Sequence, residues 1–110
     1  MPVNSRQKGA RFERDIAKRL RDWGYDARRG QQYSGLNGDA DVVGLPGVHL
    51  ELKAVEHLSI YTAMAQSCRD ARDGEKPVVI HKKNYEDILV TMKFDDWFEM
   101  YREWESGHGE

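Results

Sequence analysis

The chain has 110 residues, of which 39% are hydrophobic and 33% are charged, and its formal net charge is −2. A chain of this length suits one domain with one modest core, and its apolar fraction is too high for a disordered tail. No apolar stretch approaches the roughly 18 residues that a membrane-spanning helix needs, and the polar, basic N-terminus shows no secretory signal. We therefore expect one soluble, cytoplasmic domain that covers residues 1–110.

Charge is distributed unevenly along the chain. Residues 1–33 hold nine Lys or Arg against four Asp or Glu, whereas residues 34–110 hold eight against fifteen. The basic part, which includes Arg6 and Lys8, can attract phosphate within about one Debye length, roughly 8 Å at physiological salt. The alternative is a solvated basic helix face. The single cysteine, Cys68, excludes an internal disulfide framework, and we expect it to be a small buried side chain.

A first helix is predicted near the N-terminus. Residues 6–23 place apolar side chains along one side at helical spacing, namely Phe12, Ile16, Ala17, Leu20 and Trp23. Charged residues occupy the other positions, as in an amphipathic helix, and Gly24 follows as a C-terminal stop. We expect a short strand at residues 25–29 and a glycine-rich loop at residues 30–38 after it.

Two strand-like segments follow, at residues 41–45 and 48–53, with the turn dipeptide Pro46-Gly47 between them. They predict a β-hairpin. The two-residue period of the second strand divides its side chains between two faces of the sheet, with Val48, Leu50 and Leu52 on one and His49, Glu51 and Lys53 on the other.

The second half of the chain is predicted to hold a helix at residues 60–73, strands at 77–81 and 88–92, and a final helix at 95–105. Helices separated by strands in this order predict an α/β fold, with a mixed sheet flanked by helices. The final helix carries an aromatic stripe, which consists of Trp97, Phe98, Tyr101 and Trp104. We expect this stripe to be core or a dimer surface, because the acids of the same helix would repel DNA phosphate.

Asp41, Glu51 and Lys53 form the candidate chemical site. Antiparallel neighbours lie about 4.8 Å apart, so the hairpin brings the two carboxylates together on the face that carries Lys53. Such carboxylates repel each other unless a positive charge lies between them, and their hard oxygen atoms favour Mg²⁺ or Mn²⁺. A site of this kind hydrolyses phosphodiesters, with Lys53 orienting water or neutralising transition-state charge. Glu13 borders the apolar stripe of the first helix and is a candidate outer ligand.

Each of these residues, taken singly, also has a structural explanation. Glu51 and Lys53 can form an exposed salt bridge, and Asp41 can cap a turn or a strand. Glu13 can pair with a nearby arginine on the protein surface. Jointly, a helix acid, an aspartate that opens a strand and an acid with a lysine on the next strand form a much rarer combination, which favours the site.

The same residues resemble a known family, the PD-(D/E)xK nuclease superfamily, and within it the small archaeal-type and phage-type Holliday-junction resolvases. The resemblance rests on Glu13, Gly38-Asp39-Ala40-Asp41-Val42-Val43, Glu51-Leu52-Lys53 and the strand that begins Pro77-Val78-Val79. It covers residues 6–92 and implies a restriction-endonuclease-like αβββαββ core, followed by the C-terminal helix. It also implies a metal-dependent DNA endonuclease, structure-selective and working in a bacterial, archaeal or phage-infected cell.

The resemblance implies roles for individual residues. Asp41, Glu51 and the Leu52 carbonyl would bind Mg²⁺ or Mn²⁺, Lys53 would be the catalytic lysine, and Glu13 would be the helix acid. Gln66 matches a glutamine found near the site in relatives, although an exposed helix glutamine is also ordinary. Asp39 competes with Asp41 because both would share a strand face, and Asp41 is preferred because Val42-Val43 follows it at once.

Several side chains are candidates for contacts with DNA, namely Arg6, Lys8, Arg28, Arg29, Tyr33, Ser34, Lys82 and Lys83. Solvated charges and a polar loop are the alternative explanation for them. His49 projects beside Glu51 and is either structural or a contact to DNA or water. We also expect a homodimer, because a symmetric cut of two strands needs two sites.

Two other functions remain open from the sequence. The first is a DNA-binding module that keeps the nuclease fold without cleaving its ligand. The second is a phage-encoded interaction or inhibitor protein that works through its acidic C-terminal helix.

Overall fold

The computed structural model describes residues 5–30 and 40–108. Its elements are α1 (Ser5–Asp22), β1 (Arg28–Arg29), β2 (Val42–Val43), β3 (Val48–Ala54), α2 (Ile60–Asp70), β4 (Lys76–Lys82), β5 (Leu89–Met92) and α3 (Phe94–His108). The predicted order of three helices and five strands is confirmed, although β1 and β2 are shorter than expected. The predictions for Tyr33, Ser34 and Asp39 concern residues outside the described ranges.

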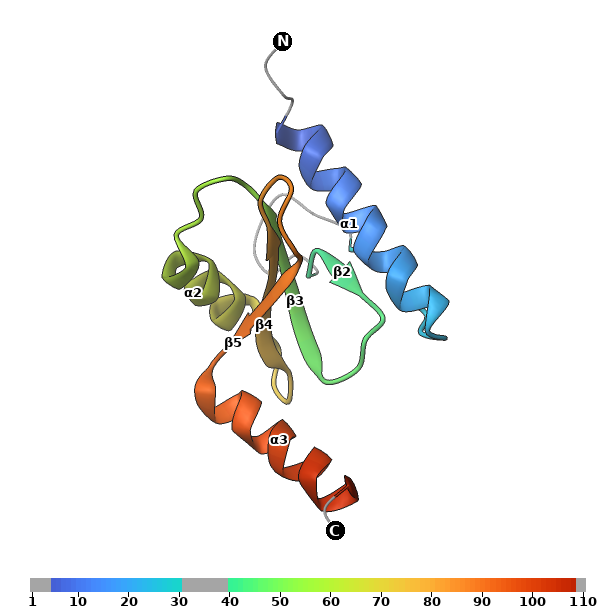
Figure 1. Ribbon diagram of the computed structural model, residues 1–110, viewed down its shortest axis with the longest axis vertical. Coiled ribbons are helices and arrows are strands. Elements are labelled where there is room, and N and C mark those ends of the chain that lie inside the picture. Colours follow the sequence, from blue (N-terminus) through green and yellow to red (C-terminus); the bar gives the residue numbers. More distant parts are fainter. Residues whose placement is uncertain (1–4, 31–39, 109–110) are drawn as a thin grey trace.

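The five strands form one mixed sheet in the order β1-β2-β3-β4-β5. The pair β3 and β4 is parallel, and the other neighbouring pairs are antiparallel. The connection between the two parallel strands runs through α2. Figure 1 shows α1 and α2 on opposite sides of the sheet, while α3 extends away from the end of β5. The molecule is elongated as a result, with extents of 54 × 34 × 29 Å.

The main core lies between α1 and one face of the sheet. Leu50 and Leu52 of β3 lie beside Val78 and Ile80 of β4, and all four are buried with residues of α1. The α1 residues of this core are Phe12, Ile16 and Ala17. The predicted apolar stripe of the first helix and the predicted alternation in the second hairpin strand are therefore confirmed, except that Trp23 is 83% exposed.

The other face of the sheet is covered by α2, which approaches it through small residues. Ser67 is fully buried, and its hydroxyl donates a hydrogen bond to the Val78 carbonyl at 3.0 Å. A small side chain at this position lets the helix backbone come close to the strands. Cys68, which we predicted to be buried, is exposed. The helix also ends at Asp70, three residues earlier than predicted, because Ala71 has extended backbone angles.

The chain turns sharply between β2 and β3. Gly44 has φ +105°, and a Cβ atom there would lie 2.0 Å from the carbonyl oxygen of Asp26, whereas Gly47 has φ +84° and open space around it. We expect Gly44→Ala to lower the free energy of unfolding by roughly 2–5 kcal/mol and Gly47→Ala by about 1 kcal/mol. Urea denaturation of the two variants measures both values. Equal losses would contradict the steric explanation.

The last helix is not part of the core. All residues of α3 are described and none is buried, so the part of the prediction that placed its aromatic stripe in the core is wrong. Phe94 and Phe98 stack with ring centroids 5.8 Å apart, and the contacts continue to Tyr101 and Trp104. The stripe therefore lies on the surface as a continuous aromatic band. Within residues 5–30 and 40–108, no helix combines the length and the apolar character that crossing a membrane requires.

Candidate active site at the open edge of β3

The hairpin brings Asp41 to the edge of β3, as predicted. Asp41 directly precedes β2, and its backbone N–H donates to the Leu50 carbonyl at 3.0 Å. Its carboxylate then accepts a hydrogen bond from the Leu52 N–H at 2.8 Å. The Asp41 side chain thus accepts the hydrogen bond from the Leu52 N–H that a backbone carbonyl of a longer β2 would have accepted. Because the N–H and C=O groups of one strand residue point toward the same side, the Leu52 carbonyl also faces this edge.

The carboxyl groups of Asp41 and Glu51 are close together. The pKa of Asp41 is raised to about 7, first by burial and then by the charges of Glu51 and Glu13 and a hydrogen bond with Glu51, while the hydrogen bond from Leu52 opposes the rise. Glu51 itself is only 4% exposed. The Asp41 carboxyl group therefore holds a proton in part at neutral pH, and a cation bound beside Glu51 would replace this proton. The hard oxygen atoms of the two carboxyl groups, with the Leu52 carbonyl at the same edge, fit a magnesium or manganese ion.

Glu13 approaches the site from α1. Its carboxylate pairs with the Arg29 guanidinium on β1 at 2.9 Å, and its negative charge is one of the causes of the raised pKa of Asp41. Glu13 therefore pairs with an arginine, as the structural explanation expected, and it also lies near the candidate ligands. Arg29, which the sequence indicated as a contact to DNA, is thus the arginine that pairs with Glu13 and partly neutralises its charge.

The Glu51 carboxylate contacts the imidazole of His49, which is 3% exposed. The His49 Nε2 atom lies 2.9 Å from Glu51 Oε1, and its Nδ1 atom lies 3.9 Å from Glu75 Oε1. Burial opposes protonation of His49, but the hydrogen bond and charge of Glu51, helped by Glu75 and Asp70, raise its pKa above the usual value. An imidazole in this position orients a carboxylate ligand. Of the two sequence interpretations of His49, the structural one fits.

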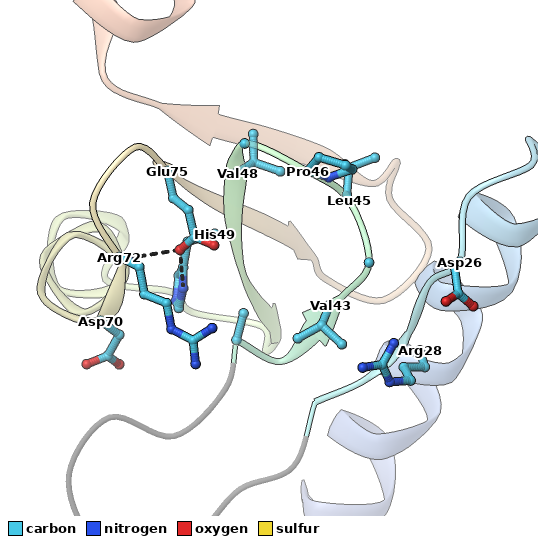
Figure 2. A pocket seen from close by; sticks show the side chains of 13 residues that line it. Asp26, Arg28, Val43, Leu45, Pro46, Val48, His49, Asp70, Arg72 and Glu75 are labelled. Atoms are coloured by element: carbon cyan, nitrogen blue, oxygen red, sulfur yellow. Dashed lines mark hydrogen bonds and ion pairs between the residues drawn. The ribbon is translucent and has the colours of Figure 1, made fainter.

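A polar cavity of about 420 Å³ lies beyond His49, between the β2–β3 turn and the end of α2. Figure 2 shows Glu75 directed toward His49, with the backbone N–H of Arg72 donating to the same carboxylate at 2.9 Å. Single ligand atoms of His49, Glu51 and Asp70 lie within 4.8 Å of one another. The described lining of the cavity includes neither Asp41 nor Glu51, so the carboxylate pair belongs to the edge of the sheet and not to this cavity.

Lys53 and Gln66 lie near the face that carries Glu51. Lys53 is partly buried on β3, two residues after Glu51, and strand alternation places both on the α2 side of the sheet. Gln66 is partly buried on α2, next to Ser67, whose hydroxyl contacts the carbonyls of His49 and Val78. Lys53 therefore lies on the same face of the sheet as Glu51, and Gln66 lies on the helix that covers this face.

The predicted contacts to DNA fall into two groups. Arg28 and Arg29 lie on β1, and Arg28 lines the cavity beyond His49. Lys8 on α1, with Lys82 and Lys83 at the end of β4, lines a second cavity at the other end of β3. Arg6 is exposed in the first turn of α1.

Comparison with known proteins points to one family. The model of a family described as "Phage putative PDDEXK endonuclease" matches residues 4–108, nearly the whole chain. No curated protein matches the chain.

Proposed function

Because the chain belongs to this phage PDDEXK endonuclease family, we propose that it is a divalent-metal-dependent DNA endonuclease that hydrolyses phosphodiester bonds at the edge of β3. The restriction-endonuclease-like fold that the sequence implied accords with the observed three helices and mixed sheet. The observation that carries the proposal is the convergence of the Asp41 and Glu51 carboxyl groups beside the Leu52 backbone. We further propose structure-selective cleavage of the kind found in Holliday-junction resolvases, inside the cytoplasm of the cell in which the protein works.

In the proposed mechanism, Asp41, Glu51 and the Leu52 carbonyl would hold Mg²⁺ or Mn²⁺. The bound ion would lower the pKa of a water molecule and polarise the scissile phosphate. Lys53 holds the attacking water in position or stabilises negative charge on the phosphate oxygens in the transition state. His49 fixes the orientation of Glu51 through the 2.9 Å contact. Glu13 and Gln66 act as positioning residues at the border of the site.

The experiment that tests this function is a panel of labelled DNA substrates. A four-way junction, a flap, a single strand and a linear duplex are incubated with the protein in Mg²⁺, in Mn²⁺ and in EDTA. We expect metal-dependent cleavage, fastest on a branched substrate. Binding without cleavage in either metal would identify a non-catalytic DNA-binding module, and the absence of both would favour an interaction protein.

We propose that the protein is a homodimer formed through the aromatic stripe of α3. This surface is exposed in one copy, with Trp97 48% and Trp104 57% accessible. DNA is a poor occupant because α3 carries five acids, Asp95, Asp96, Glu99, Glu103 and Glu105, against the single Arg102. A second copy presents the same aromatic surface, and its presence would supply the second site that a symmetric cut requires.

A charge placed in the stripe tests the dimer. We expect Trp97→Asp to convert a dimer to a monomer in sedimentation equilibrium, with little loss of folding stability because the side chain is outside the core. Glu105→Gln, near the end of the same helix, should leave the mass unchanged. A monomeric wild-type protein, or a dimer that survives Trp97→Asp, would contradict this surface.

A further inference from the structure

A basic groove lies at the C-terminal end of β3. It is a cavity of about 610 Å³ between the first half of α1 and the β4–β5 turn, which Figure 1 shows at the same end of the molecule. Four cationic side chains line it, namely Lys8, Arg11, Lys82 and Lys83. Ala54, which follows Lys53 in the chain, also lines it. Ala54 packs with the core on the α1 side of the sheet, so the groove lies at the end of β3 on the face opposite Lys53.

Two residues that line this groove, Lys8 and Asn84, hold the carboxylate of Glu56 in the way that proteins bind an anion. Its Oε2 atom accepts a hydrogen bond of 2.7 Å from the backbone N–H of Asn84 and lies 3.5 Å from Lys8 Nζ. The Asn84 hydrogen bond, with the charges of Lys8 and Lys83, lowers the pKa of Glu56. A backbone N–H group together with lysine ammonium groups is also the donor set that contacts a DNA phosphate.

Glu56 can leave this position without disturbing the core. It is exposed and lies in the segment between β3 and α2. Its partners belong to other elements, because Lys8 is on α1 and Asn84 is in the β4–β5 turn. The acid in the described lining of the groove, Asp15, is already paired with Arg19 at 3.2 Å. Glu56 is thus the acid that occupies the donors of the groove.

We propose that the groove is a binding site for a backbone phosphate of DNA, and that Glu56 occupies it as an internal competitor until DNA displaces its carboxylate. The inference rests on the proposed endonuclease function and adds a residue that regulates substrate binding. On displacement, the phosphate takes over the Asn84 N–H and the Lys8 ammonium group.

Fluorescence anisotropy of a labelled duplex in EDTA tests the proposal without any cleavage. We expect Glu56→Gln to bind about fivefold tighter than the wild-type protein, since the competing charge is removed. The matched control is Glu86→Gln, which makes the same change of charge in the neighbouring β4–β5 turn, at a residue that no described hydrogen bond or ion pair joins to Lys8 or to the Asn84 N–H. It should change the affinity by less than about twofold.

A double-mutant cycle separates competition from general charge. Lys8→Ala should weaken binding, and in that background the gain from Glu56→Gln should be smaller, because the two side chains act on the same contact. Equal gains from Glu56→Gln and Glu86→Gln, or no gain from Glu56→Gln, would overturn the proposal. The outcome is independent of catalysis: cleavage of DNA in Mg²⁺ with no effect of Glu56 would reject this inference alone, and binding without cleavage would reject the nuclease function alone.

Discussion

Replacing Lys53 with methionine is expected to lower the rate of DNA cleavage by at least about a hundredfold. Methionine keeps most of the volume of the side chain and removes its charge, so the partly buried position on β3 should remain filled. The loss should appear in the single-turnover rate with saturating protein, because Lys53 is proposed to act on the transition state more than on bound DNA. A quenched-flow assay in Mg²⁺ measures this rate.

Lys83→Met is the matched control for this variant. Lys83 carries the same charge but is exposed in the β4–β5 turn, beyond the end of β4. We expect this control to weaken DNA binding severalfold while the saturated rate changes little. If Lys53→Met cleaved at the wild-type rate, Lys53 would have no catalytic role. If the two variants lost rate equally, the effect would be one of general charge.

The strand that carries the site was predictable because its pattern is local. A two-residue period is a property of the strand itself, so the burial of Leu50 and Leu52 against α1 and the opposite placement of Glu51 followed from neighbouring residues. The hairpin was also local, since only a short turn separates the two strands. These two local features predicted that Asp41 and Glu51 lie close together, and the structure shows them close to each other.

The remaining features depend on contacts that no short pattern contains. Helical periodicity shows that one side of a helix is apolar but not which element covers it, and α3 therefore carries aromatic residues that nothing buries within the described chain. The Glu13 contact with Arg29 spans 16 positions, and the Glu56 contact with Asn84 spans 28. The path of the intervening chain decides whether such distant residues come into contact, and helical or strand periodicity does not predict that path.

Asp41→Asn is expected to abolish cleavage and to remove most of the stabilisation by Mg²⁺. The wild-type protein should gain about 2.7 kcal/mol in unfolding free energy at a metal concentration of 100 times Kd, because the folded state alone presents the site. The variant loses one of the two carboxylate ligands and should gain little. Without metal at pH 8, it should be more stable than the wild-type protein by on the order of 2 kcal/mol, since the charge repulsion with Glu51 is removed.

The raised pKa of Asp41 determines how the unfolding free energy of the metal-free protein changes with pH. The pKa of Asp41 is raised to about 7 in the folded protein from 3.8 as its ordinary value, so the folded state keeps a proton that the unfolded chain has released. The stability of the metal-free protein should therefore fall as pH rises between about 4 and about 7. The raised pKa of His49 has the same sign, with its contribution lost as pH rises above 6.5. The Asn variant should remove the Asp41 part of the slope and leave the His49 part.

Urea denaturation between pH 4 and pH 8, with EDTA or with Mg²⁺, measures both effects. Asp73→Asn, a change of the same kind at an exposed position after α2, should reproduce the wild-type slope and the wild-type gain from Mg²⁺. A steep slope retained by Asp41→Asn would place the retained proton on another group. A full gain from Mg²⁺ in that variant would exclude Asp41 as a ligand and direct attention to Asp39, the other acid of the segment before β2.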